Sequence, residues 1–266
     1  MKKYLSNKER TFRALALWTS ALLSSCALSA QPEAESPKTT PLNTYVLAAI
    51  KSMPAGGGYD ATQAAVDRLA ASVTVKESKF EENLDQVGAS FCSGATYIVF
   101  LRTIDLLHER GQVNLPAPAL ARYADLGVKD GEEIFGRWNA NGPGTAKLFA
   151  ELHCGSNFTS YEKALPGDFM KIWWTNEIGG RERGHSVIYL GSEGDKVRYW
   201  SSNIPGGYGT QTVAKSKIKR VLFSRFERHD RLDRATKLSP KNTFLADMLT
   251  KPFTWEQVVK ECRVTE

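Results

Sequence analysis

The 266-residue chain has few cysteines and no long hydrophobic run. Its four cysteines are too few for a disulfide-stabilised scaffold, and no Cys-x-x-Cys pair points to a structural zinc site. No apolar run reaches the roughly 18–20 residues that a membrane-spanning helix needs, which excludes a polytopic membrane protein. The residues that are present, 42% hydrophobic and 24% charged, have the composition of a globular protein.

Residues 1–30 have the pattern of an export signal, because basic residues precede an apolar core and small residues follow it. Cleavage after Ser29 would suit a secretory signal. The segment that ends at Cys26 also resembles a bacterial lipoprotein box, in which cleavage falls before a lipidated Cys26. The short apolar core disfavours an uncleaved membrane anchor. We therefore expect an exported protein, either periplasmic, an outer-membrane lipoprotein or secreted, which touches a membrane only through such a lipid anchor.

The basic excess of the chain comes mostly from this N-terminal segment. The whole sequence has a formal net charge of +6, but residues 1–30 contain five Lys or Arg and one Glu, which leaves about +2 for the rest. An electrostatic argument for a nucleic-acid partner therefore loses its support, and no such partner is expected.

The remaining sequence is divided into a linker and one folded unit. Residues 31–42 are rich in Pro, Glu, Ser and Thr, as flexible linkers are, and residues 43–266 are expected to form one monomeric domain. Predicted helices precede predicted strands, which favours an α+β fold with an antiparallel sheet. The expected elements are helices over about 44–53, 60–73, 95–107 and 145–153 and strands over 168–174, 185–191, 196–202 and 218–226.

Cys92 lies at the predicted start of an apolar helix. The unpaired N–H groups and partial positive charge of a helix N-terminus stabilise a thiolate and can bind an oxyanion. A small buried cysteine that packs a helix end is the alternative. Cys154 and Cys262 could form a disulfide, which would leave Cys92 as the free thiol, although sequence alone does not establish the pairing.

His185 is the best placed of the four histidines to act as a base toward Cys92. It begins a predicted strand after a loop rich in glycine and charge, where an imidazole could face a helix terminus across a cleft. His108 lies on the predicted Cys92 helix, roughly 24 Å away along its axis. His153 is expected at a helix end and His229 at a solvated charged edge. A structural role is also the alternative for His185.

Three motifs in this order resemble the papain-like cell-wall cysteine peptidases of the NlpC and CHAP types. They are Cys92-Ser93-Gly94 at a helix start, Pro166-Gly167-Asp168-Phe169, and the strand that His185 begins. The resemblance covers roughly residues 90–205. It implies a papain-like fold, with the nucleophile helix packed on an antiparallel sheet. It also implies cleavage of an amide bond in peptidoglycan stem peptides, with no cofactor and no metal.

The third member of a catalytic triad is expected on the strand after His185. Asn203 ends that strand, Ser201 lies on the same strand face as a reserve, and a simple turn is the alternative for Asn203. Gln86 lies six residues before Cys92, at the spacing of the oxyanion-hole glutamine of papain.

Further side chains near the predicted nucleophile could contact substrate or oxyanion. These are Ser93, Trp138 and Asn141, for which a core position of Trp138 and a turn at Asn141 are the alternatives. The expected function is thus that of an exported cysteine hydrolase acting on peptidoglycan or another envelope peptide. An acyltransferase on the same Cys–His scaffold and a non-catalytic envelope-binding module remain alternatives.

Overall fold

The computed structural model describes residues 42–265, which belong to one compact unit, Thr39–Glu266. The expected export signal, the lipidation site at Cys26 and nearly all of the expected linker lie outside the described residues. Within residues 42–265, no helix combines the length and the apolar character needed to cross a membrane.

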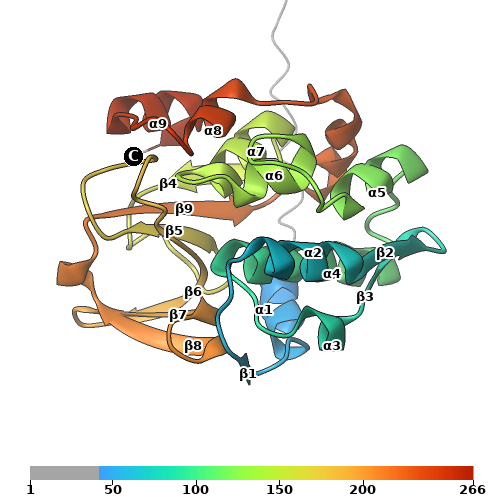
Figure 1. Ribbon diagram of the computed structural model, residues 1–266, viewed down its shortest axis with the longest axis horizontal. Helices are drawn as coiled ribbons and strands as arrows, with labels where there is room; N and C mark the ends of the chain where they lie inside the picture. Colours follow the sequence, from blue (N-terminus) through green and yellow to red (C-terminus); the bar gives the residue numbers. More distant parts are fainter. Residues whose placement is uncertain (1–41, 266) are drawn as a thin grey trace, which may run out of the picture. The chain divides into compact units, whose positions relative to one another are not determined.

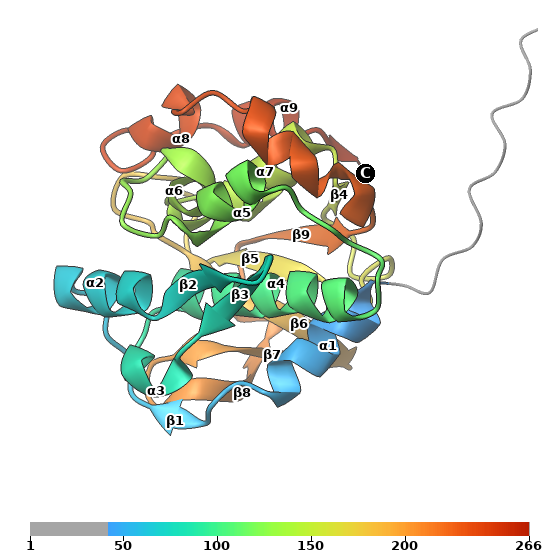
Figure 2. The same ribbon diagram turned by 90° about the vertical axis from the view of Figure 1, so that its right-hand side faces the viewer.

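An eight-stranded sheet runs through this unit in the order β1-β8-β7-β6-β5-β9-β4-β10 (Figures 1 and 2). Every neighbouring pair is antiparallel except β4 and β10, which confirms the α+β class with a mostly antiparallel sheet. The strands are β1 Gly56–Gly57, β4 Gly155–Phe158, β5 Phe169–Trp173, β6 His185–Glu193, β7 Lys196–Asn203, β8 Gly207–Ala214, β9 Arg220–Phe226 and β10 Val264–Thr265, with a separate hairpin of β2 Val73–Lys76 and β3 Lys79–Glu82.

The helices lie beside the sheet in two groups, α1 to α4 and α5 to α9 (Figure 1). The long helix α4 packs against α1, β6 and β7, while α7 packs on β4 and β9. The helices are α1 Asn43–Lys51, α2 Gln63–Ala71, α3 Leu84–Val87, α4 Cys92–Glu109, α5 Ala117–Ala124, α6 Glu133–Asn139, α7 Gly144–Leu152, α8 Thr243–Asp247 and α9 Trp255–Glu261, with 3₁₀ helices η1 Lys215–Lys217 and η2 His229–Lys237.

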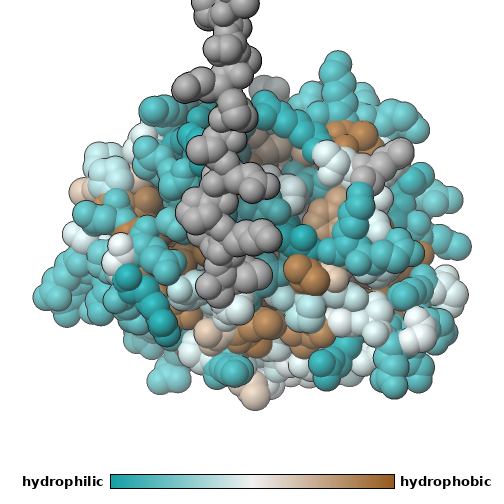
Figure 3. Space-filling view, turned by 180° about the vertical axis from the view of Figure 1, so that it is seen from behind, coloured by the Kyte–Doolittle hydropathy of each residue, from teal (hydrophilic) through white to brown (hydrophobic). Residues whose placement is uncertain are grey.

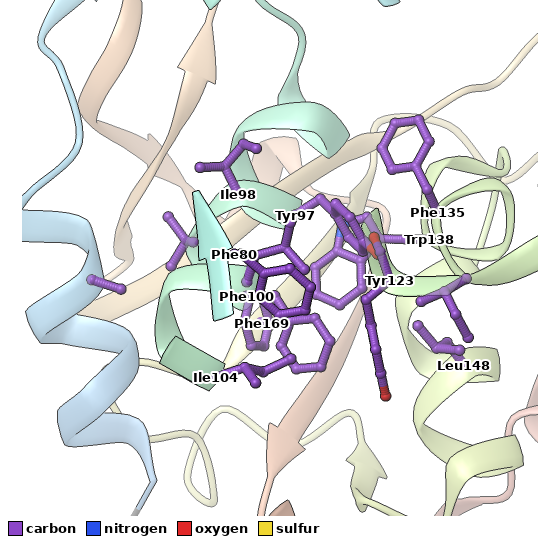
Figure 4. Packing of buried hydrophobic residues seen from close by; sticks show 14 of the residues in the cluster. Phe80, Tyr97, Ile98, Phe100, Ile104, Tyr123, Phe135, Trp138, Leu148 and Phe169 are labelled. Carbon is purple, nitrogen blue, oxygen red and sulfur yellow. The ribbon is translucent and has the colours of Figure 1, made fainter. Parts of the chain in front are cut away.

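Alternation along the strands supplies apolar side chains to both faces of the sheet. Phe169 and Ile188 belong to the main core with α4, whereas Met170 and Val187 belong to a cluster on the other face. Aromatic rings fill the main core around Phe100, which stacks on Trp138 at a centroid distance of 5.0 Å (Figure 4). Outside the core, hydrophobic residues form only separated patches on the face seen in Figure 3.

Asp168 ties α1 and two strands together. Its buried carboxylate accepts hydrogen bonds from Arg225 Nε at 2.9 Å and from Asn43 Nδ2 at 2.8 Å. A second bond from Arg225 Nη2 at 2.8 Å makes the ion pair bidentate. This aspartate of the motif Pro166-Gly167-Asp168-Phe169 therefore anchors the start of β5.

Several elements differ from those expected. The helix predicted from Asp60 begins at Gln63, because the Thr62 side chain accepts the capping hydrogen bond from Ala65 N while Asp60 accepts one from Thr62 N. Strand β8 was not predicted, because its glycines and polar residues carry no apolar alternation. It owes its conformation to pairing with β7 along its whole length.

Candidate active site

Cys92 is the first residue of α4, and the segment before it is held by strand β7 and by the loop before α2. Phe91 is extended at the helix N-cap, with φ −112° and ψ 164°. The carbonyl of Ser90 accepts hydrogen bonds from Ser202 Oγ at 2.7 Å and from Asp60 N at 3.1 Å. These contacts fix the start of α4 beside the end of β7.

His185 begins β6 and is positioned by the loop before it. Gly184 has φ +62°, and a Cβ there would lie 2.5 Å from the Ile172 carbonyl oxygen, so the turn requires glycine. The buried Glu182 closes the loop by accepting hydrogen bonds from Gly184 N at 2.8 Å and from Thr175 N at 3.0 Å. The loop thereby places the imidazole at the N-terminal end of β6.

Asn203, at the end of β7, contacts the ring of His185. Its Oδ1 lies 3.1 Å from His185 Nε2. Its Nδ2 donates to the carbonyls of Ser201 at 3.0 Å and Gly209 at 2.8 Å, which only an amide nitrogen can do. Oδ1 must therefore be the atom that faces the ring, so Nε2 carries the proton and Nδ1 is left for Cys92.

Cys92 and His185 interact electrostatically. A hydrogen bond with His185 is one cause that lowers the pKa of the Cys92 thiol. Burial by itself raises the pKa of the Cys92 thiol, but this hydrogen bond and the positive charges of His185 and Lys171 outweigh it and lower the pKa to about 6. These interactions favour the thiolate form of Cys92.

Aromatic rings flank the imidazole of His185. Trp174 stacks on it at a centroid distance of 6.5 Å, and Tyr199 meets it edge to face at 5.7 Å. The two rings limit the orientations that the imidazole can adopt and shield it from water.

Three residues beside Cys92 were not anticipated from the sequence. The Tyr59 hydroxyl lies 3.9 Å from Cys92 Sγ, and burial together with the neighbouring Cys92 raises the pKa of Tyr59, which keeps it a neutral donor. Lys171 on β5 donates a hydrogen bond to Ser186 Oγ at 3.5 Å, and burial lowers its pKa while the charge of Cys92 opposes that shift. Arg183 and Cys92 line one small hollow. A lysine inside the apolar strand Met170 to Trp173 was the one available sequence signal, because a charge there needs a partner.

Ser93 begins a chain of side-chain hydrogen bonds that passes through Asn139, at the end of α6. Its hydroxyl donates to Asn139 Oδ1 at 2.7 Å, and Asn139 Nδ2 donates to Asp130 Oδ1 at 2.8 Å. Burial raises the pKa of Asp130. Asn139 lines the hollow that contains Cys92, whereas Asn141 does not line it and is buried with an unpartnered Nδ2.

Two small hollows meet at Tyr59 and Gly184. One, of about 120 Å³, contains Cys92 with Lys171 and Arg183. The other, of about 310 Å³, is lined by His185, Asn203 and apolar or aromatic side chains, Trp174, Tyr199 and Ile204. A ligand that spans both hollows would cross Tyr59 and Gly184, with the sulfur on one side and the imidazole on the other.

Three of the expected site residues lie elsewhere. Gln86 is exposed on α3 and lines a separate hollow with residues of α2 and β3, because the short helix α3 turns it away from Cys92. Trp138 is a core residue whose Nε1 donates to Thr96 Oγ1 at 3.2 Å. Ser201 is buried and donates to the Ser186 carbonyl at 2.7 Å, so it joins two strands and does not orient His185.

The expected disulfide is also absent. Cys154 and Cys262 are free, buried thiols in different hydrophobic clusters, and burial raises the pKa of both. Among the described residues, no group of three or more His, Cys, Asp or Glu side chains is placed to hold a metal ion.

Comparisons of the chain with known protein families, with curated proteins and with solved structures found no match.

Proposed function

We propose that this protein is a papain-like cysteine hydrolase that cleaves a peptide or amide bond. The observation that carries the proposal is the position of His185, whose Nε2 lies 3.1 Å from Asn203 Oδ1 and whose interaction with Cys92 lowers the pKa of that thiol. This arrangement supplies a nucleophile, a base and an orienting group, the three roles of a catalytic triad.

The reaction follows from these positions. The Cys92 thiolate attacks the carbonyl carbon, and protonated His185 gives its proton to the departing amine as the C–N bond breaks. Water then attacks the thioester while His185 takes its proton, and the S–C bond breaks to release the carboxylic acid. The Cys92 N–H, free at the first turn of α4, and the Tyr59 hydroxyl are suited to stabilise the oxyanion.

The two hollows support a substrate with different groups on the two sides of the scissile bond. Lys171 and Arg183 favour a carboxylate on the Cys92 side, while Trp174 and Ile204 favour an apolar group on the other. Together with the resemblance to NlpC-type and CHAP-type enzymes, this points to stem peptides of peptidoglycan. The expected export of the protein fits a substrate in the cell envelope.

Iodoacetamide labelling across pH, read by mass spectrometry, tests the nucleophile. Cys92 should react with an apparent pKa near the value of about 6, and Cys92→Ala should abolish both labelling and the release of peptides from purified peptidoglycan. Cys154→Ala is the matched control, because it removes a buried thiol outside the site. A labelling midpoint near the free value of about 8.5 would argue against catalysis.

The assay of peptide release from peptidoglycan also separates hydrolysis from acyl transfer. If water is the acceptor, adding an amine nucleophile leaves the carboxylic acid as the main product. A product in which the amine has replaced water at most turnovers would identify an acyltransferase instead.

A further inference from the structure

The side chains of the 3₁₀ helix η2 lie in rows along the helix, and the rows differ in chemical type. It is nine residues long, which is unusual for this helix type, and three residues per turn align side chains at i and i+3. One row contains the buried Leu232 and Ala235, and a second contains Asp230 and Asp233. The third row consists of Arg231, Arg234 and Lys237, and Arg228 directly precedes the helix; we name these four residues the basic row.

The basic row borders a hollow of about 490 Å³ that shares no residue with the two hollows at Cys92. Arg228, Arg231 and Arg234 line it from one side. His153, at the end of α7, and Arg263, just before β10, also line it, together with small and polar residues. None of the residues that line this hollow is acidic.

Part of this positive charge is not neutralised within residues 42–265. Asp230 pairs with Arg228 at 2.9 Å and with Arg231 at 3.4 Å. Arg234 and Arg263 have no carboxylate partner within 4.0 Å in the described part of the chain. The Nε of Arg234 is buried without a hydrogen-bond partner. A buried guanidinium N–H that lacks an acceptor is unfavourable, and a bound anion would satisfy it.

His153 and Arg263 are held in strained backbone conformations at this hollow. Their φ angles are 55° and 51°, in the left-handed region that non-glycine residues avoid. Arg263 Nη1 lies 3.2 Å from His153 Nδ1. Burial lowers the pKa of His153, as do the charges of Arg263, Arg234 and Arg231. The imidazole therefore lies in the positive potential of these three arginines.

We propose that this hollow binds a ligand that carries two or more phosphate groups. Arginine binds phosphate oxygens through parallel N–H donors, and successive side chains of the basic row are spaced by roughly 6 Å along a 3₁₀ helix. A hollow of a few hundred Å³ accepts a compact ligand. The phosphates belong either to a soluble polyphosphate ester or to a phosphorylated lipid headgroup. This site is independent of the proposed hydrolase activity.

Calorimetric titration with sodium tripolyphosphate tests the proposal. Arg234→Gln with Arg263→Gln should weaken binding roughly tenfold or more, because two charge-assisted contacts are lost. Lys217→Gln with Lys219→Gln is the matched control, since it removes the same charge near the opposite end of β9 and should leave the affinity unchanged. Orthophosphate should bind more weakly than tripolyphosphate.

A second variant changes the affinity in the opposite direction, which loss of folding could not do. Asp230→Asn releases Arg228 and Arg231 from their ion pairs and should tighten binding of tripolyphosphate. The pKa of His153, followed by NMR, should rise when the anion binds.

Sedimentation with phosphatidylcholine vesicles that contain cardiolipin distinguishes the two sources. Vesicle binding that depends on Arg234 and Arg263 assigns the phosphates to a lipid headgroup, and tripolyphosphate binding without vesicle binding assigns them to a soluble ester. The proposal is overturned if neither probe binds saturably, or if the Lys217 and Lys219 control loses as much affinity as the arginine variant.

Discussion

The side-chain oxygen of Asn203 lies 3.1 Å from Nε2 of His185, and the amide nitrogen of Asn203 is held by backbone carbonyls. The asparagine therefore cannot turn its nitrogen toward the ring without breaking those bonds. One contact between the ends of neighbouring strands determines which imidazole nitrogen faces Cys92.

Asn203→Ala should lower kcat in peptide hydrolysis by roughly 10-fold, the effect of losing one hydrogen bond of about 1.5 kcal/mol. Alkylation of Cys92 should persist, because the thiol and the imidazole both remain. Thr212→Ala on β8, which lines neither hollow of the site, should keep normal activity. Equal rates for Asn203→Ala and wild type would contradict the orienting role.

Lys171→Met should raise the pKa of Cys92 from its value of about 6, because a positive charge that stabilises the thiolate is removed. The midpoint of iodoacetamide labelling should move upward by roughly half a unit to one unit. Lys196→Met, at an exposed position on β7, should leave the midpoint unchanged. The charge of Lys171 is irrelevant to the thiol if both variants titrate like wild type.

Glu82→Gln should stabilise the protein at pH 8 and have little effect at pH 4. Burial and the nearby Asp105 raise the pKa of Glu82 from 4.5 to about 7, although Arg102 opposes this. The folded state thus binds a proton that the unfolded state releases, so wild-type stability falls as pH rises from about 4.5 to about 7. The gain at pH 8 should be on the order of 2 kcal/mol in urea unfolding.

Glu81→Gln is the control for this effect, because Glu81 neighbours Glu82 but is exposed. Its unfolding free energy should follow wild type across the same pH range. A pH dependence in Glu82→Gln that matches wild type would mean that other groups govern this titration.

Asp168→Ala should destabilise the fold by about 3–5 kcal/mol, because Arg225 and Asn43 lose the carboxylate that satisfies them. Urea unfolding measures the loss. Asp247→Ala breaks only the exposed pair with Lys251 and should change stability by less than about 1 kcal/mol. A small effect of Asp168→Ala would show that water replaces the carboxylate at low cost.

The parts of the site that depend on local structure could be read from the residue pattern. A helix start at Cys92, a strand start at His185 and a strand end at Asn203 are consequences of nearby apolar periodicity and turn residues. The α+β class followed from the same periodicities. The register between β5, β6 and β7 could not be read this way, because strand pairing depends on residues far apart in the sequence.

The sequence by itself determined that a cysteine, a histidine and an asparagine stand at the ends of regular elements, where local backbone geometry presents them. Only the tertiary structure decided which side chains surround the thiol. It brought Lys171 and Tyr59 to the sulfur, and it placed Gln86 on another surface. The physical reason is that periodicity defines the face of a helix or strand, whereas the neighbour across that face is chosen by packing over the whole domain.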